Sequence, residues 1–247
     1  MFVKWYILAL HILGHVMARH RPAVEGGYQR GEETRARIIN TALVVFADRG
    51  FEGASTREIA AAAGVNAPAI QYYFDSKEGV YLECVKHVIA LLWEQVGDSV
   101  ETAERALVGP DDDAIFIAGV LGILGAVISL IRDDPQTAAW RPFLDRHQAD
   151  VGPASASIVF DEWFKGRIGR VFQELLARLM KLPVEDESIV IHSFAFFSHA
   201  LAFRAQRTGI LRSFGWTEID QPGMERIRDV ALIHARFTLE GLIRQRA

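Results

Sequence analysis

The feature that most restricts the fold of this chain lies in residues 55–77, whose sequence is STREIAAAAGVNAPAIQYYFDSK. This string predicts two short helices joined by a tight turn at Gly64, with a third helix beginning at Ser76. Two helices joined by a turn that contains glycine form a helix-turn-helix, whose second helix enters the major groove of DNA. The pattern therefore indicates a DNA-binding regulator rather than an enzyme.

Residues suited to helix capping mark the boundaries of these two helices. Ser55 or Thr56 can accept a hydrogen bond from an orphan N–H of the first helix, and Glu58 lies where a capping box needs it. Gly64 lies at the C-terminal end of the first helix, a position that often requires a positive φ. Asn66 is expected to cap the second helix, because its side-chain oxygen suits that position.

The second helix is expected to present one face to the core and another to DNA. Ile70 and Phe74 are four residues apart and should anchor it, while the amide of Gln71 can pair with adenine. Tyrosine hydroxyls and Lys77 can bond phosphates, and small alanines can contact a thymine methyl group. The expected DNA-binding residues are Thr56, Arg57, Asn66, Ala67, Pro68, Ala69, Gln71, Tyr72, Tyr73 and Lys77. The alternative for Tyr72 and Tyr73 is burial as core aromatics.

Residues 34–88 resemble the DNA-binding domain of the TetR family of bacterial transcriptional regulators. The matching stretches are 42–47 (ALVVFA), 50–51 (GF), 56–60 (TREIA), 63–65 (AGV) and 73–78 (YFDSKE). Residues 66–74, 203–205 and 211–216 further resemble the CecR-like subgroup. Gln71 stands where many family members carry tyrosine, so the operator sequence does not follow from the resemblance.

Helical spacing recurs along all 247 residues while strand-like alternation is scarce, which favours an all-α class. Half of the residues are hydrophobic, enough for a buried core. We expect an N-terminal helix-turn-helix domain of three helices, followed by a C-terminal helical domain for ligand binding and dimerisation. The expected boundaries are 1–29 for an N-terminal extension, 30–88 for the TetR-type DNA-binding domain and 89–247 for the effector-binding and dimerisation domain.

The formal net charge of −4 argues against a protein that coats nucleic acid without specificity. Specific binding needs only a local positive patch. The candidate residues for that patch are Arg30, Arg35, Arg37, Arg57 and Lys77, diluted by neighbouring glutamates. We therefore expect a moderate salt dependence of DNA binding.

Cys84 is the single cysteine, so the chain can form neither an internal disulfide nor a zinc site built on cysteines. This composition fits a reducing cytoplasm, where we expect the protein to act. Cys84 falls within a predicted helix, which favours a buried apolar role over the alternative of a redox sensor.

Two apolar segments could be mistaken for membrane spans, and neither is expected to be one. The run in residues 1–17 is too short to cross a bilayer, and a poor signal-peptide cleavage site follows it. Translation from Met17 is the preferred explanation; otherwise the run forms an amphipathic helix or an anchor on a membrane surface. Residues 114–131 are uncharged, but aspartates cap one end and Asp134 and Pro135 stop the other, which favours a helix buried in protein.

The C-terminal half is expected to consist of long helices near 111–132, 135–148, 154–181, 186–208 and 223–245. Helix 186–208 is apolar on two faces, so one of them is available to a second copy of the chain. The resemblance to the TetR family implies a homodimer through the last two long helices, here 186–208 and 223–245.

Aromatic and polar residues concentrate in this half and indicate an apolar cavity with a few polar groups, the usual form of a small-molecule site. The expected ligand-binding residues are Trp140, Phe143, His147, Trp163, Phe164, His192, Phe196, His199, Phe203 and Arg204. An ordinary aromatic core is the alternative for each of them. His192 and His199 share a helix face, but no third ligand at metal-binding spacing joins them, so neither a metal nor another cofactor is expected.

The sequence therefore predicts a ligand-responsive transcriptional regulator, expected to be a repressor. As a dimer it would bind a pseudo-palindromic operator in double-stranded DNA, and a small apolar or aromatic effector would release it. No motif of nucleotide-binding, hydrolase or metalloprotease enzymes is present. The alternative is an architectural or division-linked DNA-binding protein without a small-molecule inducer. The effector, the operator and the direction of regulation do not follow from the sequence.

Overall fold

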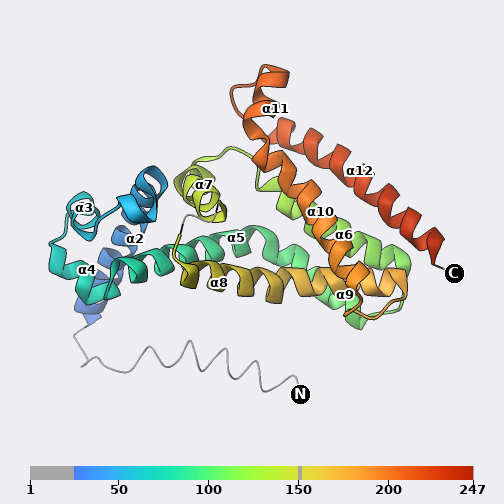
Figure 1. Cartoon of the computed structure of the whole chain (residues 1–247), viewed down its shortest axis with the longest axis horizontal. Coiled ribbons are helices and arrows are strands. Elements are labelled where there is room, and N and C mark those ends of the chain that lie inside the picture. Colours follow the sequence, from blue (N-terminus) through green and yellow to red (C-terminus); the bar gives the residue numbers. More distant parts are fainter. Residues whose placement is uncertain (1–24, 150–151, 247) are drawn as a thin grey trace. The chain divides into compact units, whose positions relative to one another are not determined.

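The computed structural model describes residues 25–149 and 152–246, and within these ranges all regular elements are helices (Figure 1). This confirms the predicted all-α class. The predicted start at Met17, and all of the predicted N-terminal extension up to residue 24, lie outside the described residues. By its backbone contacts the chain forms two units, 1–37 and 38–247, and helix α2 (Glu25–Gly53) spans the division between them.

The first unit is described from the beginning of α2 onward. There the Thr34 hydroxyl donates to the carbonyl oxygen of Arg30, one turn earlier, at 2.8 Å. The remaining helices all belong to the second unit, within which every contact below lies.

The first helix of the helix-turn-helix is α3 (Thr56–Ala62), and Ser55 caps it. The Ser55 hydroxyl oxygen accepts from the N–H of Glu58 at 3.2 Å, and the Glu58 carboxylate accepts from the N–H of Ser55 at 3.1 Å. These two bonds form the predicted capping box, which satisfies two orphan donors at once.

The second helix is α4 (Ala67–Phe74), which follows a turn at Gly64. Gly64 has a φ of 65°, a conformation that glycine adopts without steric cost. Asn66 caps α4, since its side-chain oxygen accepts from the N–H of Ala69 at 3.1 Å. The predicted turn and cap are therefore both present.

Helix α5 (Lys77–Val108) begins where two backbones approach closely. Asp75 has a φ of 63°, and the N–H of Ser76 donates to the carbonyl oxygen of Phe74 at 2.7 Å. A Cβ placed on Gly79 would lie 1.9 Å from that same carbonyl oxygen. Glycine is therefore the one residue type that fits at position 79.

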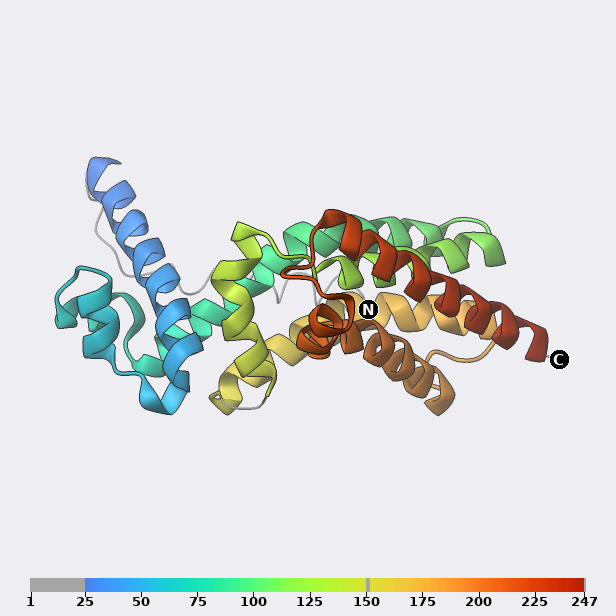
Figure 2. The same cartoon turned by 90° about the horizontal axis from the view of Figure 1, so that it is seen from above.

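Two hydrophobic cores share α5. The first joins the helix-turn-helix to α7 (Pro135–Gln148) and the start of α8 (Ala154–Trp163). The second lies among α6 (Asp113–Ser129), α9 (Arg170–Met180), α10 (Glu187–Ala205) and α12 (Gln221–Gln245), together with the end of α5. Figure 2 shows α12, in dark red, lying along the green α6, with which it packs.

Helix α6 lies at the centre of the second core and packs against α5, α9, α10 and α12. Its residues Phe116, Val120 and Ile123 are fully buried. This agrees with the expectation that residues 114–131 form a buried helix. Among the described residues, α10 is the one helix long and apolar enough to cross a bilayer, a test that core helices of soluble proteins also pass.

The structure divides two of the predicted long helices. The segment predicted at 154–181 is α8, the π-helix η1 (Phe164–Gly169) and α9 in succession. The segment predicted at 186–208 ends as α10 at Ala205, and α11 (Arg207–Phe214) follows after Gln206, whose ψ is 14°. Apolar residues continue across both divisions at helical spacing, so periodicity alone gives no sign of them.

Candidate DNA-binding face and effector cavities

Helix α4 has a buried face and an exposed face. Ile70 and Phe74 are buried against the first core, at 1% and 5% exposure. The residues exposed on α4 are Ala67, Pro68, Gln71 and Tyr72, while Ala69 and Tyr73 are half-buried. A helix anchored on one side, with a proline, an amide and a phenol on the other, has the arrangement needed to enter a DNA groove.

The two tyrosines differ in burial. Tyr72 is 64% exposed, so it is not a core aromatic, and its ring lies edge-on to Tyr73 at 5.0 Å between centroids. Tyr73 is half-buried and packs against the first core. The alternative of core burial therefore holds in part for Tyr73 and fails for Tyr72.

The other expected DNA contacts lie on α3, on the turn and at the start of α5. Thr56 is half-buried in the first turn of α3, and Arg57 is exposed beside it. Asn66 uses its side-chain oxygen for capping. The Lys77 ammonium donates to the carbonyl oxygen of Phe51 at 2.9 Å and lies 4.3 Å from the centroid of the Phe51 ring. One of its three donors is thus used within the protein.

The ten expected ligand-binding residues do not line one cavity. Trp140, Phe143 and His147 on α7 are buried in the first core. His147 Nδ1 lies 3.3 Å from the Tyr81 hydroxyl, and the Phe143 and Tyr81 rings are 4.9 Å apart. Their burial follows from the packing of α7 on the DNA-binding domain, which the sequence pattern does not reveal.

The rest of that set is dispersed over the second core and the surface. Trp163 packs on Phe160 at the end of α8. Phe196 is buried against Phe172, whereas the exposed His199 ring stacks on His234. The remaining members are Phe164, which packs on Phe197, half-buried His192, Phe203, which stacks on His199, and Arg204. No group of three or more His, Cys, Asp and Glu among the described residues could hold a metal ion.

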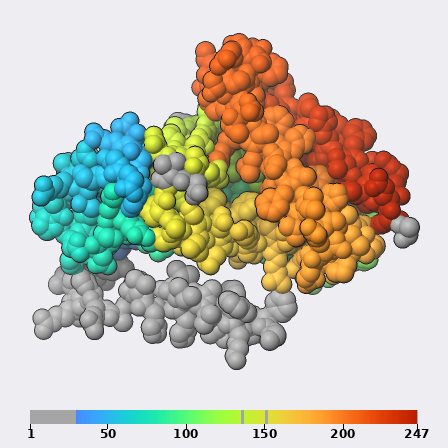
Figure 3. All heavy atoms as spheres, viewed as in Figure 1, coloured from blue at the N-terminus to red at the C-terminus, as the bar shows by residue number. Residues whose placement is uncertain are grey.

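The larger cavity, of about 780 Å³, lies between α7, α10 and α11. In the space-filling view the surface is hollowed between the yellow-green atoms of α7 and the orange atoms of α10 (Figure 3). Of the predicted ligand-binding residues, Arg204 lines it. Its other lining residues are Asp133, Ala138, Arg141, Pro142, Asp145, Gln148, Ala149, Leu201, Ala205, Arg207 and Thr208.

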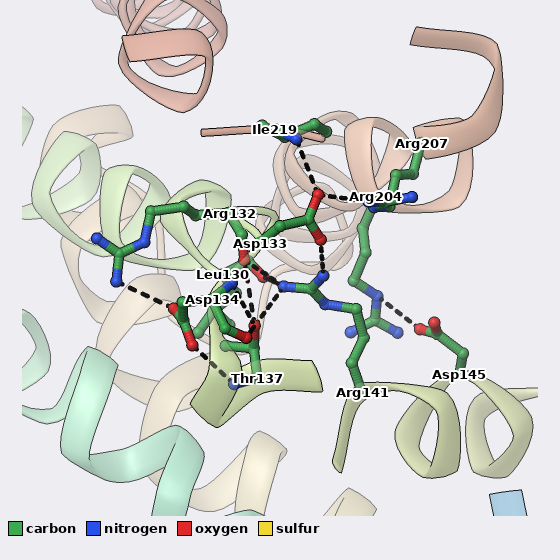
Figure 4. Close-up of polar contacts among 10 residues, drawn as sticks. All are labelled: Leu130, Arg132, Asp133, Asp134, Thr137, Arg141, Asp145, Arg204, Arg207 and Ile219. Carbon is green, nitrogen blue, oxygen red and sulfur yellow. Dashed lines mark hydrogen bonds and ion pairs between the residues drawn. The ribbon is translucent and has the colours of Figure 1, made fainter. Parts of the chain in front are cut away.

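An ion-pair network holds the walls of this cavity together, as Figure 4 shows. Asp133 accepts hydrogen bonds from Arg141, Arg207 and the backbone N–H of Ile219. Burial raises the pKa of Asp133, but the bonds from Arg207, Ile219 and Arg141 outweigh it, so its pKa lies below the ordinary value. The carboxylate is therefore charged at neutral pH and joins α7 to α11 and the loop after it.

The smaller cavity, of about 360 Å³, lies between the π-helix and α10. Phe164, Phe194 and Phe197 contribute apolar walls, and Lys165 and Gln173 contribute polar ones. Of the predicted ligand-binding residues, Phe164 lines it. π-Helical turns are rare and occur often at functional sites.

Sequence reasoning did not single out three residues that shape these sites. Arg141 and Arg207 line the larger cavity, and Gly79 sets the junction between α4 and α5. Arg207 gave no signal, because its partner Asp133 lies 74 positions earlier in the chain. Gly79 had one signal, since it directly follows the matching stretch 73–78.

Comparison with known proteins agrees with this arrangement. Residues 38–84 match the family model of bacterial regulatory proteins of the tetR family, and residues 120–242 match that of the CecR C-terminal domain. The chain is 32% identical over 214 residues to the HTH-type transcriptional dual regulator CecR of Shigella flexneri, covering 86% of this chain and 94% of CecR. Over 70 to 92 residues it is also similar to other helix-turn-helix regulators, including the activator FasR of Mycolicibacterium smegmatis at 37% identity, covering 35% of this chain and 38% of FasR.

Solved structures share the fold at low sequence identity. A transcriptional regulator from Pseudomonas aeruginosa PAO1 superposes with a TM-score of 0.60 at 18% identity, covering 87% of this chain and 95% of that one. AibR in complex with isovaleryl coenzyme A and operator DNA superposes with a TM-score of 0.55 at 18% identity, covering 81% and 96%.

The fold and the exposed face of α4 define a DNA-binding transcriptional regulator, which is not an enzyme. The chain belongs to the TetR family of bacterial regulatory proteins, and its C-terminal half is of the CecR type.

Proposed function

We propose that this protein is a ligand-responsive repressor that binds a pseudo-palindromic operator as a homodimer and leaves it when a small-molecule effector binds. One observation carries the proposal: α7 belongs to both halves of the molecule. Phe143 and Leu144 are buried in the core of the DNA-binding domain, while Arg141 and Asp145 of the same helix line the larger cavity. A ligand in that cavity therefore contacts a helix on which the DNA-binding domain rests.

The DNA-binding domain is assigned to residues 30–88 and the effector-binding and dimerisation domain to residues 89–247. Pro68 and Gln71, both exposed on α4, set the base preference, because amides discriminate bases in the major groove. Thr56, Tyr73 and Lys77 set the overall affinity through phosphates. The remaining members of the interface are Arg57, Asn66, Ala67, Ala69 and Tyr72.

The homodimer is assigned to α10 and α12, the two helices that the resemblance to the TetR family implies. Ile191 and Phe194 on α10 are 59% and 66% exposed. Val230, Ile233 and Phe237 on α12 are between 52% and 64% exposed. Large apolar side chains gathered on two neighbouring helices are costly in water, and a second copy of the same surface covers them. This pairing also accounts for the apolar composition of α10.

Release follows if the effector favours a conformer in which the two copies of α4 no longer match the spacing of the half-sites. The coupling needed is about 1–3 kcal/mol, a factor of roughly 5 to 150 in operator affinity. The AibR structure contains isovaleryl coenzyme A and operator DNA in one complex, so a protein of this fold can bind both a small molecule and DNA. CecR is named a dual regulator, so a reporter fused to the target promoter is needed to decide between repression and activation.

The first test uses the purified protein and DNA from upstream of its own gene. Fluorescence anisotropy with unlabelled nonspecific competitor should show specific binding of one dimer per site at physiological salt. Gln71→Ala should change the ranking of single-base operator variants, while Lys77→Ala should weaken all of them alike. An unchanged ranking in Gln71→Ala would refute the base-reading role. Uniform binding to many unrelated fragments would instead indicate an architectural protein.

A further inference from the structure

The larger cavity contains more positive than negative charge. Three arginines line it, Arg141, Arg204 and Arg207, against two carboxylates, Asp133 and Asp145. Figure 4 shows Asp133 between Arg141 and Arg207, and Arg204 directed toward Asp145. Each arginine contacts a carboxylate, but the charged residues that line this open cavity carry one positive charge in excess.

The arginines also have unused hydrogen-bond donors. The Nε atoms of Arg141 and Arg207 are buried and have no partner among the described residues. Arg141 is 8% exposed, and its two terminal nitrogens are already bonded to Asp133, Thr137 and backbone carbonyl oxygens. A buried donor without an acceptor destabilises the folded protein.

Arg204 is held more loosely than Arg141. Its Nε lies 3.2 Å from an Asp145 oxygen, and it also bonds to Gln148. Both partners are exposed and lie near the C-terminal end of α7, so they can turn away into solvent. Burial lowers the pKa of Arg204, which reflects the cost of keeping its charge in this cavity. An incoming anion can therefore replace Asp145 as the partner of Arg204.

Part of the remaining wall of the cavity is apolar. Leu201 and Ala205 on α10 and Ala138 and Pro142 on α7 contribute this apolar surface. A volume of about 780 Å³ is in the range of sites for drug-sized ligands. The space thus combines an excess positive charge at the arginines with a hydrophobic surface beside them.

We infer that this cavity binds an amphipathic organic acid, a molecule with one carboxylate that pairs with Arg204 and Arg207 and an apolar body that packs on Leu201 and Pro142. The inference rests on the proposed function, since it gives the chemical class of the effector. Neutral apolar or aromatic compounds, which belong to the effector class predicted from the sequence, lack a carboxylate to pair with the arginines. Displacement of Asp145 by the acid would alter α7 at the point where it leaves the DNA-binding core.

The test is a calorimetric titration of the full chain with decanoate, 4-butylbenzoate and 2-naphthoate, each beside its neutral primary amide. At least one acid should bind about tenfold or more tightly than its amide, and Arg204→Gln and Arg207→Gln should each remove that preference. Arg212→Gln is the matched control, since Arg212 is on α11, is exposed and does not line the cavity. If no acid surpasses its amide, or if Arg212→Gln acts as the cavity variants do, the anion site is wrong.

Operator affinity measured in the same samples separates this inference from the proposed function. Binding of the acid through Arg204 with no effect on operator affinity leaves the anion site standing and removes effector-controlled release. The opposite result is a compound that releases the operator while Arg204→Gln and Arg207→Gln leave its binding unchanged. That result keeps effector-controlled release and removes the anion site. Circular dichroism of each variant confirms that it is folded before either result is used.

Discussion

Arg146 on α7 donates through its Nε to the backbone carbonyl oxygen of Ala47 on α2, at 3.0 Å. Its Nη2 donates to the neighbouring carbonyl oxygen of Asp48 at 3.1 Å. These carbonyls lie just before Gly50, where φ of 71° interrupts α2, so they are at the end of a helical segment. A guanidinium suits such a position, because the C-terminal end of a helix carries a partial negative charge.

Arg146→Met should weaken the connection between the cavity and the DNA-binding domain. The variant loses two charge-assisted bonds in a half-buried position, so the free energy of unfolding should fall by ~1–3 kcal/mol. Under the proposed mechanism, effector binding should be retained while its effect on operator affinity shrinks. Calorimetry and anisotropy on one sample measure the two quantities. Arg178→Met, which removes an exposed arginine on α9, is the control and should leave both unchanged.

Gly79→Ala should damage the helix-turn-helix itself. Its Cβ would overlap the carbonyl oxygen of Phe74, and backbone atoms there cannot move without separating α4 from α5. We expect a loss of ~2 kcal/mol or more in urea unfolding, together with loss of operator binding.

Gly122→Ala is the matched control for this substitution. Gly122 also lies within a helix, but a Cβ there meets nothing within 4 Å. Alanine should therefore be neutral or stabilise by up to ~1 kcal/mol through helix propensity. Equal losses in both variants would mean that the close contact at Gly79 is not the cause.

The features that the sequence predicted correctly are local ones. Ser55, Gly64 and Asn66 act within a few residues of their own positions, and the anchors Ile70 and Phe74 follow from helical spacing. Such interactions are set by chemistry within one or two turns, so a single sequence contains them.

The cavity depends on contacts that are distant in sequence. Asp133 meets Arg207 across 74 positions, and Arg146 meets Ala47 across 99. Aromatic composition pointed to Trp140, Phe143 and His147 as ligand contacts, whereas the structure buries them under the DNA-binding domain. Which core a helix face joins is decided by tertiary packing, which periodicity leaves open.

Because of Tyr81, the free energy of unfolding should fall as the pH rises in the alkaline range. Burial raises its pKa to about 12 from an ordinary 10.0, so the folded state favours the neutral phenol. The stabilisation from this hydroxyl is fully present below pH 10 and is lost as the pH rises through about 12. The measurement is urea unfolding at several pH values, from pH 8 to the highest pH at which the fold survives. The free energy of unfolding should decline more steeply with pH for the wild type than for Tyr81→Phe. Parallel declines would mean that the Tyr81 hydroxyl is not the group responsible.

The exposed aromatics of α10 and α12 give the decisive test of how two copies associate. Phe194 and Phe237 are 66% and 64% exposed in one chain. In a dimer with two-fold symmetry, both copies of each residue would be buried in the interface. Burial of one phenylalanine stabilises by ~1.5–3 kcal/mol, so Phe194→Glu or Phe237→Glu should convert the dimer largely to monomer at micromolar concentration. Light scattering during size-exclusion chromatography measures the mass. Val108→Glu places the same charge at a residue 89% exposed on α5, and this variant should stay dimeric.

Monomers should also lose operator affinity, since a single α4 contacts one half-site. Dimers that persist in both α10 and α12 variants would mean that another surface joins the copies, and the exposed apolar face would then need a different partner.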